Sequence, residues 1–454
     1  MLQKNDRPNL FEKLIYASGQ VGLNAMATLF SSYVLFFYTD VIGIKAATVG
    51  TIILFSKLFD GFSDIIAGQL VDKHKSKYGH CIPVIMRWTI PMTVSVIFVF
   101  MVPRTIPALQ YAFIFVTYNL FNTIFYTYVS MAYTALPSYA TDNDTDRSQM
   151  CVLTMLAAAA MQTILASTIM PMVEAFGGQN SQMAWVKSIA VFGALGVVFL
   201  YLNVLFVKER VENSAPAENV LVGLKCAVQN KYWVYSLLAN ICNNAVLVFN
   251  LSVSVYYLNN VVGNMQLMGA YVGVSNIPGV IMMMFIPALL TKISKRKLAV
   301  FGSILMLAGQ LLFILGPSNS IPWLLGTALV RGIGFGFTMG LNGAMVGDCI
   351  DYGEWKTGVR VQSVLFSSNS VGVKVGSGLL TSALGFFLTA IGYDGLKQAQ
   401  DAATIAGIDN FFKFVPIAVF ILLLVFSWLF DLEGKLPGIQ KELEERRGKL
   451  EMKQ

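Results

Sequence analysis

The feature that most constrains this chain is a succession of long apolar stretches separated by short polar breaks. Each stretch approaches or exceeds the roughly 20 apolar residues that a helix needs to cross a bilayer. We predict twelve membrane spans, at residues 14–38, 44–71, 83–102, 109–138, 149–173, 184–207, 233–258, 265–290, 297–316, 321–347, 362–393 and 408–431. The sequence therefore predicts an all-α polytopic membrane protein of twelve transmembrane helices.

The charged residues support this prediction. Only 13% of the chain is charged, against about 25% in soluble domains, and the net charge of +7 resides in short loops rather than on one stripe. We therefore expect no nucleic-acid partner. Lysine and arginine gather in alternate connections, which by the positive-inside rule places both termini in the cytoplasm. We expect a multi-pass protein of a plasma membrane, in bacteria the inner membrane, that functions as a monomer.

The longest polar interruption, from Val207 to Lys231, follows the sixth span. Basic loops follow the second and the eighth spans, as expected for two parallel six-span repeats. We predict an N-terminal six-helix bundle (1–206), a cytoplasmic linker (207–232), a C-terminal six-helix bundle (233–432) and a cytoplasmic tail (433–454). The charged tail is expected to form a solvated helix.

Three ionisable residues interrupt the second span. Lys57, Asp60 and Asp64 are spaced i, i+3 and i+7, so they project from one helical face. Charge inside a bilayer is costly and marks transport pathways, and two carboxylates one turn apart can hold a small cation or take up a proton. The alternative is a structural salt bridge between Lys57 and Asp60, with Asp64 at the water boundary.

A second intramembrane charge, Lys374, lies in the eleventh span, with Asn369 and Ser370 on the same side. Its ammonium can balance the aspartates or bind a polar substrate, or it can extend toward the interface. Arg331 in the tenth span has no partner that spacing identifies.

Uncharged polar residues extend this pattern. Such groups suit a hydroxyl-rich ligand, and they serve equally well as hydrogen bonds between membrane helices. They are Gln20 and Asn24 on the first span, Tyr126, Thr127 and Ser130 on the fourth, and Asn240, Asn243 and Asn244 on the seventh.

Signals of catalysis are missing from the sequence. The five cysteines are odd in number and widely spaced, and the two histidines share one basic loop, so neither a disulfide framework nor a metal cluster is indicated. No pair of histidine ligands, activated serine or cysteine, or nucleotide loop is found. We expect no enzyme and no cofactor beyond a coupling ion.

Two segments carry a family resemblance. The first runs from Lys57-Leu-Phe-Asp-Gly-Phe-Ser-Asp64 through Asp72, and the second is Asp351-Tyr-Gly-Glu-Trp-Lys-Thr-Gly-Val-Arg360, followed by Lys374. Both resemble motifs of the glycoside-pentoside-hexuronide:cation symporters of the major facilitator superfamily, which include the melibiose permease. The segment Phe37-Tyr-Thr-Asp-Val-Ile-Gly43 is also similar. The resemblance covers nearly the whole chain.

The resemblance implies uptake of a sugar, glycoside or hexuronide with Na+ or H+, by alternating access of two six-helix halves. It implies that Asp60 and Asp64 bind the cation with help from Thr127, and that Lys374 lies beside them. Ser63 stands where the melibiose permease has asparagine, so the choice of cation stays open.

The resemblance also implies a different sugar pocket from that of the permease. Asn24 and Ser130 stand where the permease has sugar-holding aspartates, and Met155 where it has an arginine, which makes an anionic glycoside easier to admit. We hypothesise that a cation at the aspartates releases Lys374 and organises a central pocket. The expected lining is Gln20, Asn24, Tyr126, Ser130, Asn243, Asn369, Ser370 and Lys374. Rival functions are a cation-coupled carrier of a lysolipid or other amphiphile, and a passive channel.

Overall fold

The structure is a computed structural model of the whole chain. It describes residues 7–73, 79–141, 143–210, 220–317, 319–358, 365, 368–397 and 399–451. Side chains within the described helices are not described at residues 58, 61–73, 144, 148, 220–224, 368–371, 444 and 446–451. The described residues form helices and connecting segments, without a strand among them.

The first part of the chain forms seven α-helices and two π-helical segments. They are α1 (Leu10–Phe36), η1 (Phe37–Val41), α2 (Ala46–Lys73), α3 (Ile82–Phe100), α4 (Pro107–Asn119), η2 (Leu120–Tyr126), α5 (Thr127–Ala140), α6 (Asp144–Ala175) and α7 (Gln182–Phe206). The helices α4, η2 and α5 follow one another without a break and form one continuous rod.

The second part contains the remaining elements. They are α8 (Val220–Gln229), α9 (Lys231–Val248), η3 (Phe249–Val253), α10 (Ser254–Tyr257), η4 (Leu258–Val262), η5 (Met265–Leu267), α11 (Met268–Leu290), α12 (Lys295–Leu315), α13 (Ile321–Thr357), α15 (Ser368–Ala390), α16 (Ala402–Leu429) and α17 (Leu436–Glu451).

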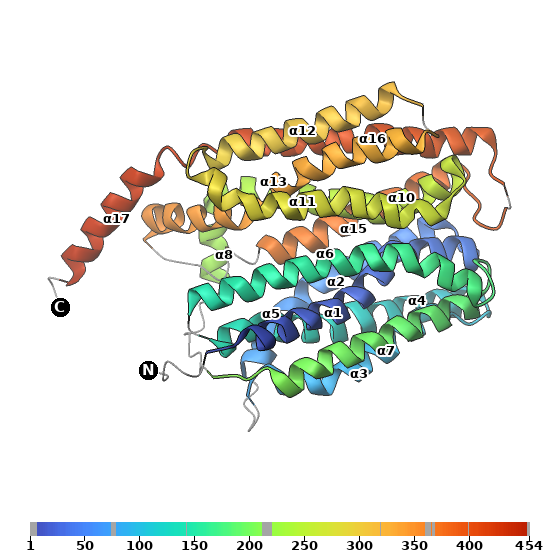
Figure 1. Cartoon of the computed structure of the whole chain (residues 1–454), viewed down its shortest axis with the longest axis horizontal. Coiled ribbons are helices and arrows are strands. Elements are labelled where there is room, and N and C mark those ends of the chain that lie inside the picture. The colour runs from blue at the N-terminus through green and yellow to red at the C-terminus, as the bar shows by residue number, and fades with distance from the viewer. Residues whose placement is uncertain are drawn as a thin grey trace. The chain divides into compact units, whose positions relative to one another are not determined.

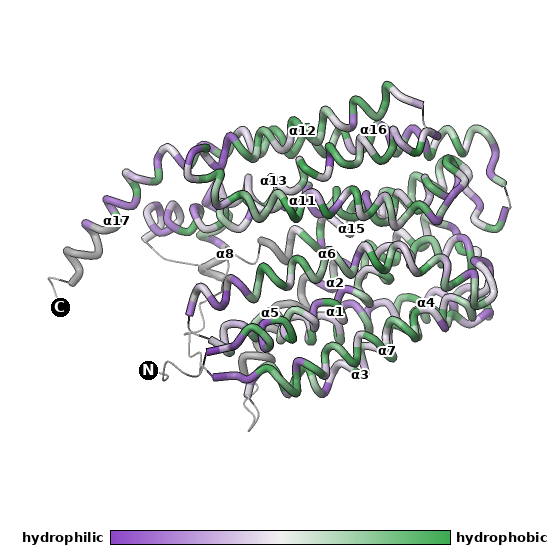
Figure 2. Tube along the Cα trace, in the orientation of Figure 1, coloured by the Kyte–Doolittle hydropathy of each residue, from purple (hydrophilic) through white to green (hydrophobic). Residues whose placement is uncertain are grey.

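Ten of the described helical stretches are long and apolar enough to cross a membrane. The other two spans are α2 and the rod of α4, η2 and α5, so the predicted all-α architecture of twelve transmembrane helices is confirmed. Figure 2 shows the same alternation: α7 and α12 are mainly apolar along their length, whereas α17 is mainly hydrophilic.

One predicted boundary differs by ten residues, and another lies outside the described residues. The tenth span was expected to end at residue 347, but α13 continues to Thr357, because the chain contains no helix stop before Gly358. Gly358 adopts the left-handed conformation (φ 72°) and donates its N–H to the carbonyl of Glu354. The expected linker contains the helix α8. The eleventh span was expected to start at 362; residues 359–364, 366 and 367 lie outside the described part, which resumes with α15 at Ser368.

The tail helix α17 is only partly solvated. Its apolar side chains at Leu436, Ile439 and Leu443 are buried in a cluster that includes Tyr232 on α9 and Cys349 on α13. Three apolar residues at helical spacing thus form a packing face.

The helices divide into two compact units. Unit 1 comprises residues 1–214, 251–273 and 381–408, and unit 2 comprises residues 215–250, 274–380 and 409–454. In unit 1, α1 packs against α6 and α7, and α3 packs against α7; in unit 2, α12 packs against α13 (Figure 1). The predicted division into two six-helix bundles at 207–232 stays a prediction.

Charged residues fasten the first helices of unit 1. The carboxylate of Glu209 accepts hydrogen bonds from the backbone N–H groups of His80, Cys81 and Ile82, at 2.6 to 2.8 Å. A carboxylate at the start of α3 satisfies N–H groups that have no partner within the helix. Glu12 binds Arg210 through two hydrogen bonds of 2.7 and 2.8 Å. Glu209, Glu12 and Arg210 therefore hold helix ends of unit 1 together.

Candidate functional site

The site begins at Asp60, a carboxylate buried in the middle of α2. Its residue is 1% exposed. The ammonium of Lys57 lies 3.5 Å from Asp60 Oδ2, and the side-chain amide of Asn122 donates a hydrogen bond to the same oxygen. A buried carboxylate requires such compensation, because its desolvation costs several kcal/mol.

The amide of Asn122 reaches Asp60 from the π-helical segment η2. A π-helix adds a residue to the turn and is frequent at functional sites. Thr127 Oγ1 donates to the backbone carbonyl of Asn122, five residues earlier, at 3.0 Å. Asn119, at the end of α4, donates to Ser56 on α2 at 2.8 Å. The rod therefore faces α2 with the side-chain amides of Asn119 and Asn122.

The structure thus links two of the predicted cation ligands. Asp60 and Thr127 are connected through Asn122, one via its amide and the other via its carbonyl. The side chains of Ser63 and Asp64 lie outside the described residues. The ion pair between Lys57 and Asp60 also agrees with the alternative, in which the two residues form a purely structural salt bridge. A coupling role for Asp60 therefore stays a prediction.

Sequence reasoning missed Asn122. The available signal was the pair of amides at Asn119 and Asn122 in an otherwise apolar rod. Residues three positions apart lie on one face of a helix, so this spacing predicts that both amides face the same neighbour. The sequence does not show that this neighbour is α2.

The predicted substrate residues of unit 1 lie on α1 and on the rod. Gln20 and Asn24 are partly buried on α1. Tyr126 packs against Phe121, with ring centroids 5.8 Å apart. Ser130 Oγ donates to the carbonyl of Thr127 at 3.2 Å. These residues supply uncharged polar groups, and their contact with a substrate stays a prediction.

In unit 2, the asparagines of α9 form hydrogen bonds. Asn243 is buried and its Oδ1 accepts from Thr338 on α13 at 2.8 Å. Asn244 donates to Oδ1 of Asn240 at 2.5 Å. For Asn243 this is the interhelical role that was the alternative to substrate binding.

Two glycines of α15 fix the face on which Lys374 lies. A Cβ at Gly372 would be 2.3 Å from Oδ1 of Asn240, and one at Gly376 would be 2.4 Å from the carbonyl oxygen of Ile241. This small-residue spacing lets α15 approach α9 closely. Lys374 is two residues from each glycine and therefore lies on the opposite face. The side chains of Asn369 and Ser370 lie outside the described part of the chain.

Arg331, whose role the sequence left open, is buried inside unit 2. Its guanidinium donates to Gln310 and lies 5.6 and 5.8 Å from the ring centroids of Phe313 and Phe412. Gln310 in turn donates to the carbonyls of Phe412 and Lys413. These contacts give Arg331 a role in packing α12, α13 and α16 together.

The described part of the motif that begins at Asp351, up to Gly358, forms the end of α13 and its cap. Gln440 on α17 donates to Asp351 at 3.1 Å, and Trp355 Nε1 donates to Glu442 at 2.7 Å. The motif therefore holds the tail helix α17.

A second polar cluster closes the end of unit 1 away from Leu10. Tyr393, after α15, donates to Asp40 Oδ1 at 2.5 Å, and Thr39 donates to Asp40 Oδ2 at 2.6 Å. The hydroxyl of Tyr256 on α10 lies 3.0 Å from Thr39 Oγ1. We call Thr39, Asp40, Tyr256 and Tyr393 the Asp40 latch. It joins the end of α1 to segments more than 200 residues later.

The sequence model of a family described as MFS/sugar transport protein matches residues 15–434. The isoprimeverose transporter of Lactiplantibacillus pentosus is 26% identical over 440 residues, which cover 96% of this chain and 91% of that protein. The glucuronide carrier protein homolog of Escherichia coli strain K12 is 26% identical, covering 95% of each chain.

Solved structures with the same fold include the nucleoside transporter NupG, with a TM-score of 0.62, 13% identity and coverage of 93% of this chain and 98% of that one. A bacterial homolog of the human lysosomal transporter Spinster matches with a TM-score of 0.64 and 11% identity, covering 93% of this chain and 95% of that one.

Proposed function

We propose that this chain, which belongs to the MFS/sugar transport protein family of the major facilitator superfamily, couples uptake of a sugar, glycoside or hexuronide to Na+ or H+ by alternating access. It is a multi-pass sugar-transport carrier, as the resemblance to glycoside-pentoside-hexuronide symporters indicated.

The observation that carries this proposal is the buried carboxylate of Asp60. Its compensation by Lys57 is loose, at 3.5 Å, and Asn122 binds the same carboxylate oxygen. The backbone carbonyl of Asn122 and the hydroxyl of Thr127, which bind each other, are oxygen donors of a kind that suits a hard cation. A cation that settles here displaces the ammonium of Lys57 from the carboxylate. A proton on Asp60 has the same effect, since it removes the negative charge that attracts the ammonium.

The substrate then binds among the polar groups near the cation. Gln20, Asn24 and Ser130 are uncharged hydrogen-bonding groups, so they suit sugar hydroxyls and place no negative charge against an anionic sugar. The named relatives support both neutral and acidic sugars, because one carries isoprimeverose and another is a glucuronide carrier homolog. Lys374 supplies a counter-charge for an acidic substrate.

The Asp40 latch supports alternating access. Its hydrogen bonds join η1 to α10 and to the segment after α15, and Ser382 on α15 donates to the carbonyl of Gly50 on α2 at 3.0 Å. The two later segments of unit 1, residues 251–273 and 381–408, are thus fastened to its first helices. Opening that end requires these bonds to break, and the cation and the substrate bias the transition by preferring one state over the other.

A substrate panel on the purified protein tests the proposal. Ligands that bind the folded state raise the melting temperature by mass action. We expect a glycoside or hexuronide to raise it, and the rise to increase with Na+ or between two pH values. Stabilisation by lysolipids with none by any sugar would overturn the substrate class, and stabilisation indifferent to both Na+ and pH would contradict cation coupling.

A further inference from the structure

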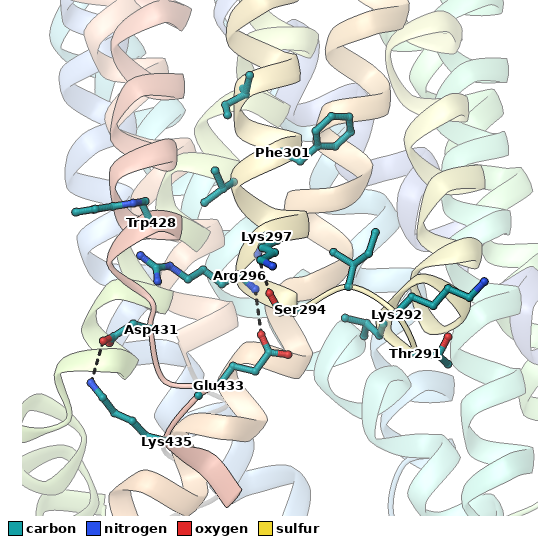
Figure 3. Close-up of a pocket in the computed structure, with 15 residues that line it drawn as sticks. Thr291, Lys292, Ser294, Arg296, Lys297, Phe301, Trp428, Asp431, Glu433 and Lys435 are labelled. Carbon is teal, nitrogen blue, oxygen red and sulfur yellow. Dashed lines mark hydrogen bonds and ion pairs between the residues drawn. The ribbon is translucent and has the colours of Figure 1, made fainter.

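A groove of about 1220 Å³ lies at one end of unit 2, outside the transport site. It is formed by the end of α11, the loop 291–294, the start of α12, the end of α16 and the segment that leads to α17. Figure 3 shows the residues that line it. Two features of the lining, its charges and its exposed apolar side chains, indicate the kind of ligand that fits.

The acidic residues of the groove already have partners. Asp431 accepts hydrogen bonds from Tyr232 at 2.6 Å and from Lys435 at 2.9 Å. Glu433 accepts from the backbone N–H of Lys295 at 3.1 Å and thereby caps the start of α12. The charge of Asp431 is therefore balanced by Lys435, and the carboxylate of Glu433 is held at the start of α12.

The remaining basic residues are not neutralised in this way. In the part of unit 2 that the structure describes, no carboxylate forms an ion pair with Lys292, Arg296 or Lys297. The guanidinium of Arg296 instead lies 5.6 Å from the ring centroid of Trp428 (Figure 3). Three positive charges at one mouth attract an anion.

Apolar side chains continue from these cations along the spans. Trp428 is 60% exposed, Phe301 52% and Ile304 49%. They belong to α16 and α12, which are membrane spans, so their exposed faces meet hydrocarbon. Tryptophan at the end of a span is typical of the headgroup level. A soluble anion would contact only the basic residues, whereas a phospholipid has a headgroup for the basic residues and acyl chains for the apolar side chains.

We propose that this groove binds a phospholipid with an anionic headgroup, which places its phosphate at Lys292, Arg296 and Lys297 and an acyl chain along Phe301 and Ile304. In the predicted orientation, the lipid belongs to the cytoplasmic leaflet, where the loop 291–297 lies. Basic pockets beside membrane helices are known to select such lipids by charge.

Native mass spectrometry of the whole protein tests the proposal. The protein is incubated with equal amounts of phosphatidylglycerol and phosphatidylcholine, and the ratio of the bound lipids is measured. We expect wild type to retain phosphatidylglycerol preferentially. Each cation contributes about five-fold, the equivalent of about 1 kcal/mol, so Lys292→Gln alone should lower the ratio about five-fold, and the variant with Lys292, Arg296 and Lys297 all replaced by glutamine should abolish the preference.

The matched control removes three exposed charges elsewhere, by replacing Lys45, Lys187 and Lys397 of unit 1 with glutamine, and should keep the wild-type ratio. An equal loss in control and groove variants would overturn the proposal, because it would show a general charge effect. Short-chain dihexanoyl phosphatidylglycerol and inorganic phosphate should compete poorly; displacement of the lipid by inorganic phosphate would instead identify a site for a soluble anion. The single variant Lys292→Gln keeps the test decisive if the triple variant does not fold.

Discussion

Replacing Tyr393 with phenylalanine removes one hydroxyl from the Asp40 latch and leaves the ring in place. The lost bond is the 2.5 Å donation to Asp40 Oδ1. A hydrogen bond to a charged group contributes about 1.5–3 kcal/mol. At 1.4 kcal/mol for each factor of ten, the ratio of latched to open molecules should fall roughly 10- to 100-fold. The latched end of unit 1 should therefore open far more often.

Labelling of a buried position measures this change. Ser252 is 1% exposed, donates to the carbonyl of Ser31 and lies four residues before Tyr256 of the latch. In a protein without its native cysteines, a cysteine at this position should therefore react with a hydrophilic maleimide only in open molecules. We expect Tyr393→Phe to raise the labelling rate roughly 10- to 100-fold. The control Tyr201→Phe also removes a tyrosine hydroxyl, which donates at 3.0 Å to the carbonyl of Met86 on α3, away from the latch, and should label like wild type.

Equal labelling rates in the two tyrosine variants would refute this reasoning. That result would mean that the hydroxyl of Tyr393 contributes nothing to closure, and that the contacts of α15 with α2 hold the end shut without the latch.

The remaining predictions concern unit 2. A Cβ at Gly376 would lie 2.4 Å from a carbonyl oxygen of α9, so Gly376→Ala should lower the free energy of unfolding by about 1–3 kcal/mol. The control Gly347→Ala, which has no atom within 4 Å of its Cβ, should not lower it. Equal melting temperatures of the two variants would contradict the close-packing argument. Hydrogen bonds from Tyr232 and Lys435 lower the pKa of Asp431 to about 2, below the ordinary value of about 3.9. The stability that ionised Asp431 adds is therefore present above pH about 4 and is lost as the pH falls through about 2. The difference in melting temperature between wild type and Asp431→Asn should shrink over this range. A difference that grows as the pH falls would contradict this prediction.

Much of the fold was predictable because the bilayer imposes a simple rule on the sequence. Every backbone polar group in hydrocarbon must be satisfied within the structure, so long apolar runs become helices. The same rule identified Asp60, since a charge inside such a run is costly. Neither inference depends on which helices are neighbours.

What could not be predicted depends on neighbours that are distant in sequence. Asp40 lies in a segment singled out for its family resemblance, but its partner Tyr393 is more than 350 residues away. Asn122 donates to Asp60 on another helix, and the hydropathy pattern does not show that α2 is the neighbour of the rod. The burial of Leu443 on α17 likewise depends on a surface formed by other helices.

The most direct test of cation coupling is gradient-driven uptake by proteoliposomes that contain Asp60→Asn. The substitution keeps the shape of the side chain and removes the charge that pairs with Lys57 at 3.5 Å. The control Asp401→Asn removes a carboxylate whose side chain is 76% exposed. Uptake of a labelled substrate from the stabilising panel is measured with an imposed Na+ gradient and with an imposed pH gradient.

We predict that Asp60→Asn loses accumulation against the substrate gradient but still exchanges internal for external substrate, while Asp401→Asn accumulates it like wild type. Full accumulation by Asp60→Asn under the gradient that drives wild type would contradict the central claim, and would leave Asp60 and Lys57 as a structural salt bridge.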